Sequence, residues 1–233
     1  MSEAMTVESL IDAYWQMRGF YTRQRFTYQP GDAGYYSDID VLAYNARTNE
    51  MVFAESKAHG GKGKIKNGVL DDKYYKNLVE GEHAVNDDLH KFIWGVIRIV
   101  RDKEELFPNE ISKTTRIIIH FVSTIYYSKS HRIVEKITEF VSSAIRGVLK
   151  KKVDVEVRIE THFDVLINLI EFVKNDEQGK RYGVPVLDII RELNRHLGLL
   201  GNVTKEPKNR KKGKNQGHIV ANKERIRQVL ELL

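Results

Sequence analysis

The stretch that most constrains the fold runs over residues 37–57, with the sequence SDIDVLAYNARTNEMVFAESK. Its two arms, residues 38–44 and 51–57, are mostly apolar, whereas Arg, Thr and Asn within residues 46–49 between them favour a tight turn. Short apolar arms that flank a polar turn are typical of a β-hairpin. The chain is therefore expected to contain a sheet built around this hairpin.

A four-residue turn fixes which residues of the two arms lie opposite each other. Asp40 is then expected opposite Glu55, and Asp38 opposite Lys57. Directly opposed residues project to the same face of a sheet, so the four charges gather at one end of one face. The other face carries small apolar side chains that suit close packing against a helix: Val41, Ala43, Val52 and Ala54. Because two opposed carboxylates repel each other unless a cation lies between them, the hairpin predicts a divalent-metal site.

These residues resemble the pattern of the PD-(D/E)xK nuclease superfamily, which includes many restriction enzymes and the archaeal Holliday-junction resolvases. The family carries an Asp on one strand and Glu-x-Lys on the next; here these are Asp40 and Glu55-Ser56-Lys57, with Ile39 in place of the Pro. The resemblance extends to Glu8, which precedes the hairpin at a place where many members carry a further acid. It implies an α/β fold of the restriction-endonuclease-like type, a mixed sheet with an αβββαβ core flanked by helices, here with a helical C-terminal extension.

The resemblance also implies a reaction, namely hydrolysis of phosphodiester bonds by a Mg²⁺-dependent DNA endonuclease. Mg²⁺, which Mn²⁺ can replace, would be held by Asp40, Glu55 and the backbone carbonyl of Ser56. Lys57 would hold or deprotonate the attacking water. Glu8 either supports the metal site or is a first-turn residue favoured by the helix dipole.

Two other interpretations of the hairpin remain open. The first is a nucleic-acid-binding module on the same fold that lacks turnover. Such a module would bind nucleic acid but would not need all of Asp40, Glu55 and Lys57. A structural protein would use the four charges as a cross-strand ion-pair ladder. Such a ladder favours a cation opposite Asp40, where the pattern instead places Glu55.

Hydrophobic periodicity predicts the remaining elements. Strands are expected at about residues 20–28, 115–122 and 153–160. Helices are expected at about residues 6–18 with Thr6 as N-cap, within 70–85, and at about 87–103, 130–149, 161–174, 185–200 and 222–233. His120 interrupts an apolar strand and is expected to be a hydrogen-bonded core residue rather than a ligand, and the acids of residues 153–160 are expected on a solvated edge.

The order of these elements suggests how the chain is divided. Residues 1–175 are expected to form the nuclease-like core and residues 176–204 a helical extension. Residues 205–220 are expected to be a basic flexible segment, followed by a C-terminal helix over residues 221–233. There is no cysteine and no apolar run of the ~18 residues that would span a membrane, so a soluble cytoplasmic protein is expected. Relatives in the superfamily often dimerise to cut two strands, so a homodimer is compatible with the resemblance.

Positive charge is concentrated in one short segment. Residues 205–214 contain six Lys or Arg and one Glu, a local charge of +5 in a chain whose formal net charge is +6. This segment, and the Gly- and Lys-rich loop after the hairpin, are candidate contacts to a nucleic-acid backbone, although each could equally be a solvated loop. The candidate residues are Lys62, Lys64, Lys66, Lys208, Arg210, Lys211, Lys212 and Lys214.

The basic segment gives a prediction that does not depend on the hairpin. Each phosphate contact contributes about −0.9 to the slope of log affinity against log salt concentration for duplex DNA. Replacing the five basic residues from Lys208 to Lys214 by Gln should therefore flatten that slope by up to about 4 if all of them contact duplex. The measurement is DNA binding at several salt concentrations with Ca²⁺ in place of Mg²⁺. Equal slopes for the mutant and the parent would show that the segment is only a linker.

Overall fold

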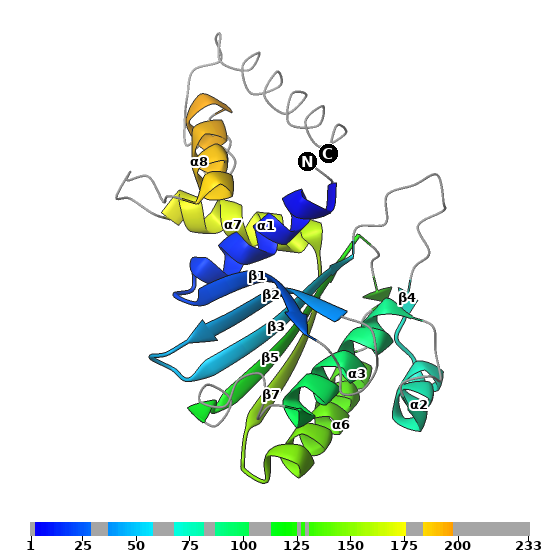
Figure 1. Ribbon diagram of the computed structural model, residues 1–233. Helices are drawn as coiled ribbons and strands as arrows, with labels where there is room; N and C mark the ends of the chain where they lie inside the picture. The colour runs from blue at the N-terminus through cyan, green and yellow to red at the C-terminus, as the bar shows by residue number, and fades with distance from the viewer. Residues whose placement is uncertain are drawn as a thin grey trace, which may run out of the picture. The chain divides into compact units, whose positions relative to one another are not determined.

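The computed structural model describes residues 3–28, 37–57, 68–81, 87–102, 113–124, 127–128, 131–175 and 184–197. The chain divides into two compact units, Met1–Ile167 and Asn168–Leu233. The first unit holds the sheet and the helices that pack on it (Figure 1). The second holds the end of α7 and helix α8.

Helices and strands alternate along the first unit in an α/β pattern. The helices of the described chain are α1 (Glu3–Gln16), α2 (Asp72–Glu80), α3 (Asp88–Arg101), α6 (His131–Leu149), α7 (His162–Asn175) and α8 (Pro185–Leu197). The strands are β1 (Tyr21–Tyr28), β2 (Ser37–Asn45), β3 (Glu50–Lys57), β4 (Gly68–Val69), β5 (Arg116–Ser123), β6 (Tyr127–Ser128) and β7 (Asp154–Thr161).

The main sheet has five strands in the order β1-β2-β3-β5-β7. The β1–β2 and β2–β3 pairs are antiparallel, whereas β3, β5 and β7 run parallel to one another. Parallel strands need crossover connections, and helices α3 and α6 supply them (Figure 1). The carboxyl ends of the three parallel strands therefore lie together at one end of the sheet, beside the start of β2. The expected α/β class, with a mixed sheet flanked by helices, is confirmed.

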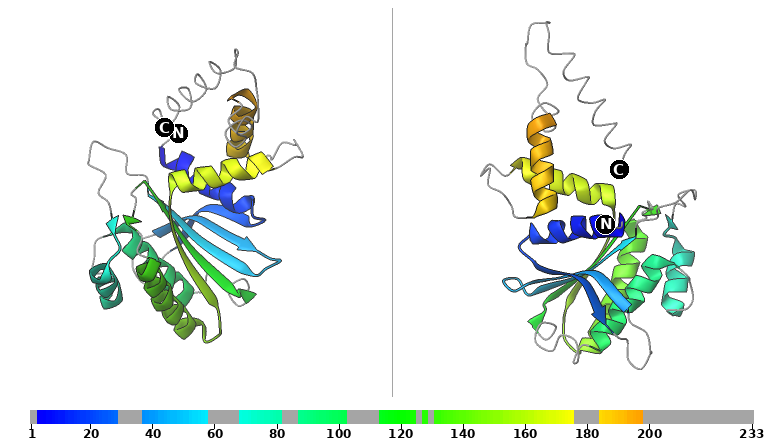
Figure 2. Two further views of the ribbon diagram at one scale, coloured as in Figure 1. Left: turned by 180° about the vertical axis from the view of Figure 1, so that it is seen from behind. Right: turned by 45° about the horizontal axis from the view of Figure 1, so that its top comes forward.

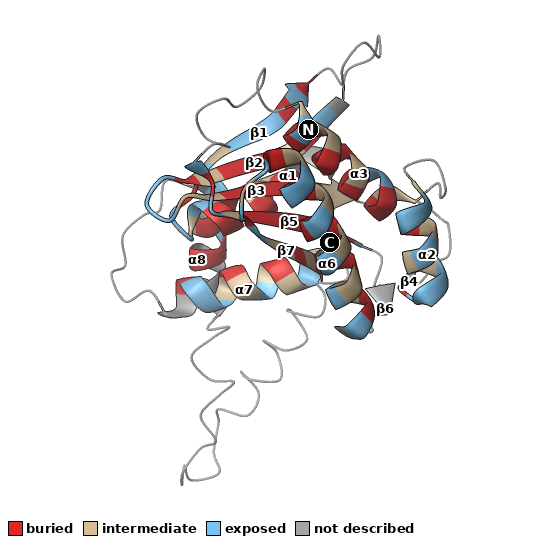
Figure 3. Cartoon of the chain, turned by 90° about the horizontal axis from the view of Figure 1, so that it is seen from below, coloured by how far each residue is buried: buried red, intermediate tan, exposed pale blue. Residues whose placement is uncertain are grey.

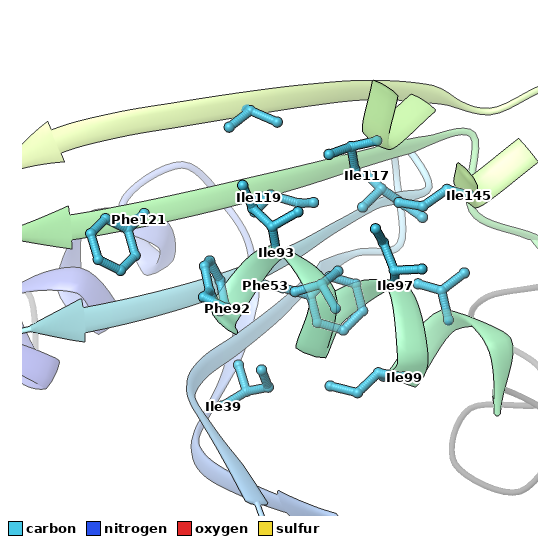
Figure 4. Packing of buried hydrophobic residues seen from close by; sticks show 14 of the residues in the cluster. Ile39, Phe53, Phe92, Ile93, Ile97, Ile99, Ile117, Ile119, Phe121 and Ile145 are labelled. Carbon is cyan, nitrogen blue, oxygen red and sulfur yellow. The ribbon is translucent and has the colours of Figure 1, made fainter. Parts of the chain in front are cut away.

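The two faces of the sheet are covered by different helices. Helices α3 and α6 pack on one face and α1 on the other (Figures 1 and 2). The α3–α6 face is a continuous apolar core in which Phe53, Ile119 and Phe121 are fully buried (Figure 4). The small side chains predicted to pack against a helix are buried on the face that α1 covers: Val41, Ala43, Val52 and Ala54. Most exposed positions of the sheet fall on the edge strand β1 (Figure 3).

The structure changes several details of the predicted elements. Helix α1 already begins at Glu3, so Thr6 lies inside the helix and is not its N-cap. A capping box opens α7, because Thr161 and Asp164 exchange hydrogen bonds of 2.8 and 3.1 Å. Strands β4 and β6, of two residues each, form a second small sheet that the hydrophobic pattern did not indicate.

Candidate functional site

The charged end of the hairpin lies where β3 ends and β2 begins. The β2–β3 ladder has the predicted register, from Asn45↔Glu50 to Val41↔Ala54. It stops one pair short of the expected pairing of Asp40 with Glu55. Asp40 turns its side chain toward β3 instead, and its Oδ2 accepts a hydrogen bond from the Ser56 N–H at 2.7 Å. The two carboxylates are therefore brought together by a side-chain contact to the main chain rather than by a ladder pair.

Glu55 is the most constrained acid of this site. The residue is 8% exposed, and its Oε1 pairs with the Lys57 ammonium. Its Oε2 is buried and has no hydrogen-bond partner among the described residues. Burial and, after it, the negative charge of Asp40 raise the pKa of Glu55 to about 7, against the opposing effect of Lys57. When Glu55 is ionised, its Oε2 therefore has no positive partner among the described residues to balance its charge.

The neighbouring charges respond to the same environment. Burial raises the pKa of Asp40, with smaller contributions from Glu8 and Asp38, although the Ser56 N–H and Lys57 oppose the shift. Burial by itself lowers the pKa of Lys57, but the attraction of Glu55 and the hydrogen bond to it outweigh burial, so the pKa is raised. Lys57 is therefore held as an ammonium ion. Its ion pair is formed with Glu55, whereas the hairpin pattern had predicted Asp38 opposite it.

These residues suit a hard divalent cation. Within the part of the chain that the structure describes, no three His, Cys, Asp or Glu side chains converge as a metal-binding group. Mg²⁺, however, is commonly held by only one or two carboxylates, with water and substrate phosphate completing its shell. Asp40 and Glu55 provide two carboxylates, and the buried Oε2 of Glu55 is an oxygen that still lacks a partner. The donor set therefore fits Mg²⁺.

Glu8 lies on the α1 face beside this site, in an ion pair that the sequence did not indicate. It is 6% exposed, and its carboxylate is bound by both arms of the Arg25 guanidinium, at 2.9 Å from Nε and 3.3 Å from Nη2. Because α1 begins at Glu3, Glu8 lies beyond the first turn, and the helix-dipole interpretation does not apply. The charge of Glu8 raises the pKa of Asp40, which places it within electrostatic range of the hairpin acids.

Ser56 is held on a second side by a residue from far along the chain. Its Oγ lies 3.1 Å from Nε2 of His162, the first residue of α7. The main chain of Ser56 is already fixed by Asp40. Nothing in the sequence singled out His162, because the pairing depends on β7 running parallel to β3 and delivering α7 to the same edge of the sheet.

His120 is a core residue, as expected. It is fully buried, accepts a hydrogen bond at Nδ1 from Trp15 Nε1 at 3.1 Å, and lies 2.7 Å from Glu160 Oε2 through Nε2. The Trp donor requires a lone pair on Nδ1, so Nε2 carries the proton and donates a hydrogen bond to Glu160 Oε2. Burial lowers the pKa of His120. A neutral imidazole held between two fixed partners is unsuited to binding a metal.

Two acids of β7, Glu156 and Glu160, differ from the prediction of a solvated edge, whereas Asp154 is exposed as predicted. Glu156 forms ion pairs with both Arg116 and Arg158, and Glu160 binds His120. Hydrogen bonds and positive charge lower the pKa of both acids even though burial acts in the other direction. The face of β7 that carries them is therefore a half-buried ion-pair network.

The predicted backbone contacts lie outside the described residues. This applies to the loop residues Lys62, Lys64 and Lys66 and to the segment residues Lys208, Arg210, Lys211, Lys212 and Lys214. Within the described ranges, no helix combines the length and apolarity required to cross a membrane.

Comparisons with known proteins add little to this description. No family model matches the chain, and neither does any curated protein. A solved structure described as protein of unknown function AF1548 is similar over 94% of this chain and 97% of that chain, at 15% sequence identity and a TM-score of 0.36. A TM-score this low carries no argument about fold or function.

Proposed function

We propose that the protein is a Mg²⁺-dependent DNA endonuclease of the PD-(D/E)xK type, built on a restriction-endonuclease-like fold. The observation that carries the proposal is the state of Glu55. Its carboxylate is buried beside Asp40, one oxygen is bound to Lys57, and the other is left without a partner among the described residues. The order of elements from α1 to β7 is compatible with the αβββαβ core of that superfamily.

A purely structural ion-pair cluster fits this geometry poorly. A buried polar atom normally has a hydrogen-bond partner, and leaving a charged one unpaired destabilises the fold. The cluster combines Asp40 and Glu55 with a single ammonium, Lys57, which is bound to Glu55. Sites with too few cations for their buried carboxylates are commonly functional rather than stabilising. A divalent cation would supply the missing charge.

Each residue of this site would then have a distinct role. Asp40 and Glu55 would hold the cation, and Ser56, whose N–H is bound by Asp40 and whose Oγ contacts His162, would present its main-chain carbonyl to it. When bound, Mg²⁺ would polarise the phosphate and lower the pKa of a bound water. Lys57 keeps its proton at Nζ in the resting site, so it would orient the attacking water and balance the negative charge that develops on the phosphate.

The direct test is cleavage of plasmid DNA and of matched duplex, single-stranded and branched oligonucleotides, each with Mg²⁺ and with EDTA. The proposal expects nicking or cutting of at least one DNA substrate that depends on the metal. Binding of DNA without any turnover in Mg²⁺ or Mn²⁺ would favour the non-catalytic binding module instead. Calorimetry that detects no Mg²⁺ or Mn²⁺ binding would contradict both the metal site and the nuclease.

A further inference from the structure

The side-chain alternation of β1 breaks at Arg25. Consecutive residues of a strand point to opposite faces of a sheet. Gln24 and Arg25 nevertheless both reach α1: Gln24 Nε2 donates to Asp12 Oδ2 at 2.9 Å, and Arg25 Nε donates to Glu8 Oε2 at 2.9 Å. Arg25 has a backbone φ of +50°, in the left-handed region that residues other than glycine rarely adopt. The strained backbone therefore redirects this one guanidinium.

The strand keeps its pairing across Arg25, although the faces of its side chains change over there. Phe26, two residues after Gln24, lies in the core on the opposite, α3–α6 face, and the Arg23 guanidinium lies 5.0 Å from the centre of the Phe26 ring. The β1–β2 ladder keeps one register across the break, with Gln24↔Val41 before it and Phe26↔Ile39 after it. The strand thus returns to its regular pairing immediately. Strain confined to one non-glycine residue is characteristic of functional sites.

Arg25 is redirected to the acidic end of the hairpin. Its position in β1 is level with Asp40 in β2, between the ladder pairs that flank the break. The hydrogen bond and charge of Glu8, with smaller contributions from Asp38 and Asp40, raise the pKa of Arg25. The Arg25 side chain is 51% exposed, whereas that of Glu8 is 8% exposed. One edge of the guanidinium is thus bound to a buried carboxylate while the rest of it is open to solvent.

We propose that Arg25 binds a phosphate of the substrate strand through the solvent-exposed edge of its guanidinium, while the Nε and Nη2 donors stay on Glu8; this inference rests on the proposed nuclease function. The planar guanidinium fork fits carboxylates and phosphates in the same two-armed geometry. A phosphate that approaches Asp40 and Glu55 is repelled by both acids, and Arg25 offsets that repulsion from the adjacent strand. Glu8 is the buried partner that keeps the guanidinium aimed at the site.

The test compares two variants of Arg25 with a matched control. Arg25→Gln removes the charge and the fork. Arg25→Gly does the same and suits the positive φ, so it covers the case in which the first variant folds poorly. Arg23→Gln removes an equal charge two residues away on the opposite face and serves as the control. Fluorescence anisotropy with a labelled DNA duplex and with its separate strands, in EDTA and in Ca²⁺, measures affinity over a series of salt concentrations.

Both Arg25 variants should bind DNA about 10- to 100-fold more weakly, because each loses a hydrogen bond between charged groups. Arg23→Gln should bind DNA nearly as the parent does. The salt slope for duplex should flatten by about 0.9. In Mg²⁺, KM should rise more than kcat falls. Glu8→Gln should change DNA affinity in the opposite direction, because it frees the Arg25 guanidinium, and it should tighten DNA binding in EDTA. The double variant Glu8→Gln/Arg25→Gln should show no such tightening.

The outcomes separate this inference from the proposed function. If the parent binds and cleaves DNA while both Arg25 variants match Arg23→Gln in affinity and salt slope, the assignment of Arg25 is wrong and the nuclease stands. Tightening by Glu8→Gln that persists in the Arg25→Gln background also overturns it. If the parent neither binds nor cleaves any nucleic acid, both proposals fail.

Discussion

Replacing Asp40, Glu55 or Lys57 by alanine should abolish Mg²⁺-dependent DNA cleavage, a loss of at least about 10³-fold for each variant. The two acids would hold the cation, and Lys57, whose ammonium is bound to Glu55, would offset the negative charge of the incoming phosphate. Loss of any one of them removes either the metal or the charge that stabilises the transition state. Cleavage rates under single-turnover conditions, measured on the best substrate of the panel, give the effect.

The control for this prediction is Asp154→Asn. Asp154 is an exposed acid at the start of β7, at the end of the sheet away from the carboxyl ends of the parallel strands. The variant makes a comparable loss of charge and should cleave as the parent does. The alanine variants should keep the circular dichroism spectrum and the DNA affinity of the parent. A near-parental cleavage rate in either the Asp40 or the Glu55 variant would remove the metal site from the proposal.

Mg²⁺ affinity should rise steeply with pH up to about pH 7 and level off above it. A carboxylate must lose its proton to bind a cation, and burial beside Asp40 raises the pKa of Glu55 to about 7. Below that pH each unit should cost about tenfold in affinity for the one proton released. Calorimetric titrations in two buffers with different ionisation enthalpies measure both the affinity and the proton release. A Mg²⁺ affinity that stays constant between about pH 5.5 and about pH 8 would contradict a metal bound by Glu55.

The same shift predicts how the metal-free protein responds to pH. The folded-state pKa of Glu55 lies above its ordinary value of 4.5, so the folded chain holds this proton more tightly than the unfolded chain. The free energy of unfolding should therefore fall as pH rises from 4.5 through about 7, by up to about 1.4 kcal/mol per pH unit. Glu55→Gln cannot titrate and should show a smaller decline. Thermal unfolding in EDTA across this range makes the comparison, and parallel pH profiles for the two proteins would show that Glu55 is not the group responsible.

The sequence by itself determined the hairpin and most of the elements around it. The four-residue turn of the hairpin determined the ladder from Val41↔Ala54 to Asn45↔Glu50, because the length of a hairpin loop sets which residues of the two strands lie opposite each other. Long apolar periods likewise located α3, α6 and β5 to within a residue or two of their observed ends. The buried environment of His120 followed from the apolar strand around it. These are local patterns that one segment carries on its own.

Tertiary structure alone decided which residues meet at the charged edge. Arg25 reaches Glu8 only because the backbone of β1 turns left-handed at one residue, and the sequence gives no sign of this because arginine rarely adopts a positive φ. His162 reaches Ser56 only because two parallel crossovers bring β7 and the start of α7 to the edge where β3 ends. Burial of Glu55 likewise requires helices from elsewhere in the chain to exclude water from its carboxylate. Sequence periodicity reports the face on which a residue lies, whereas ion pairs and desolvation depend on segments brought together from far apart in the chain, and only the folded packing supplies those.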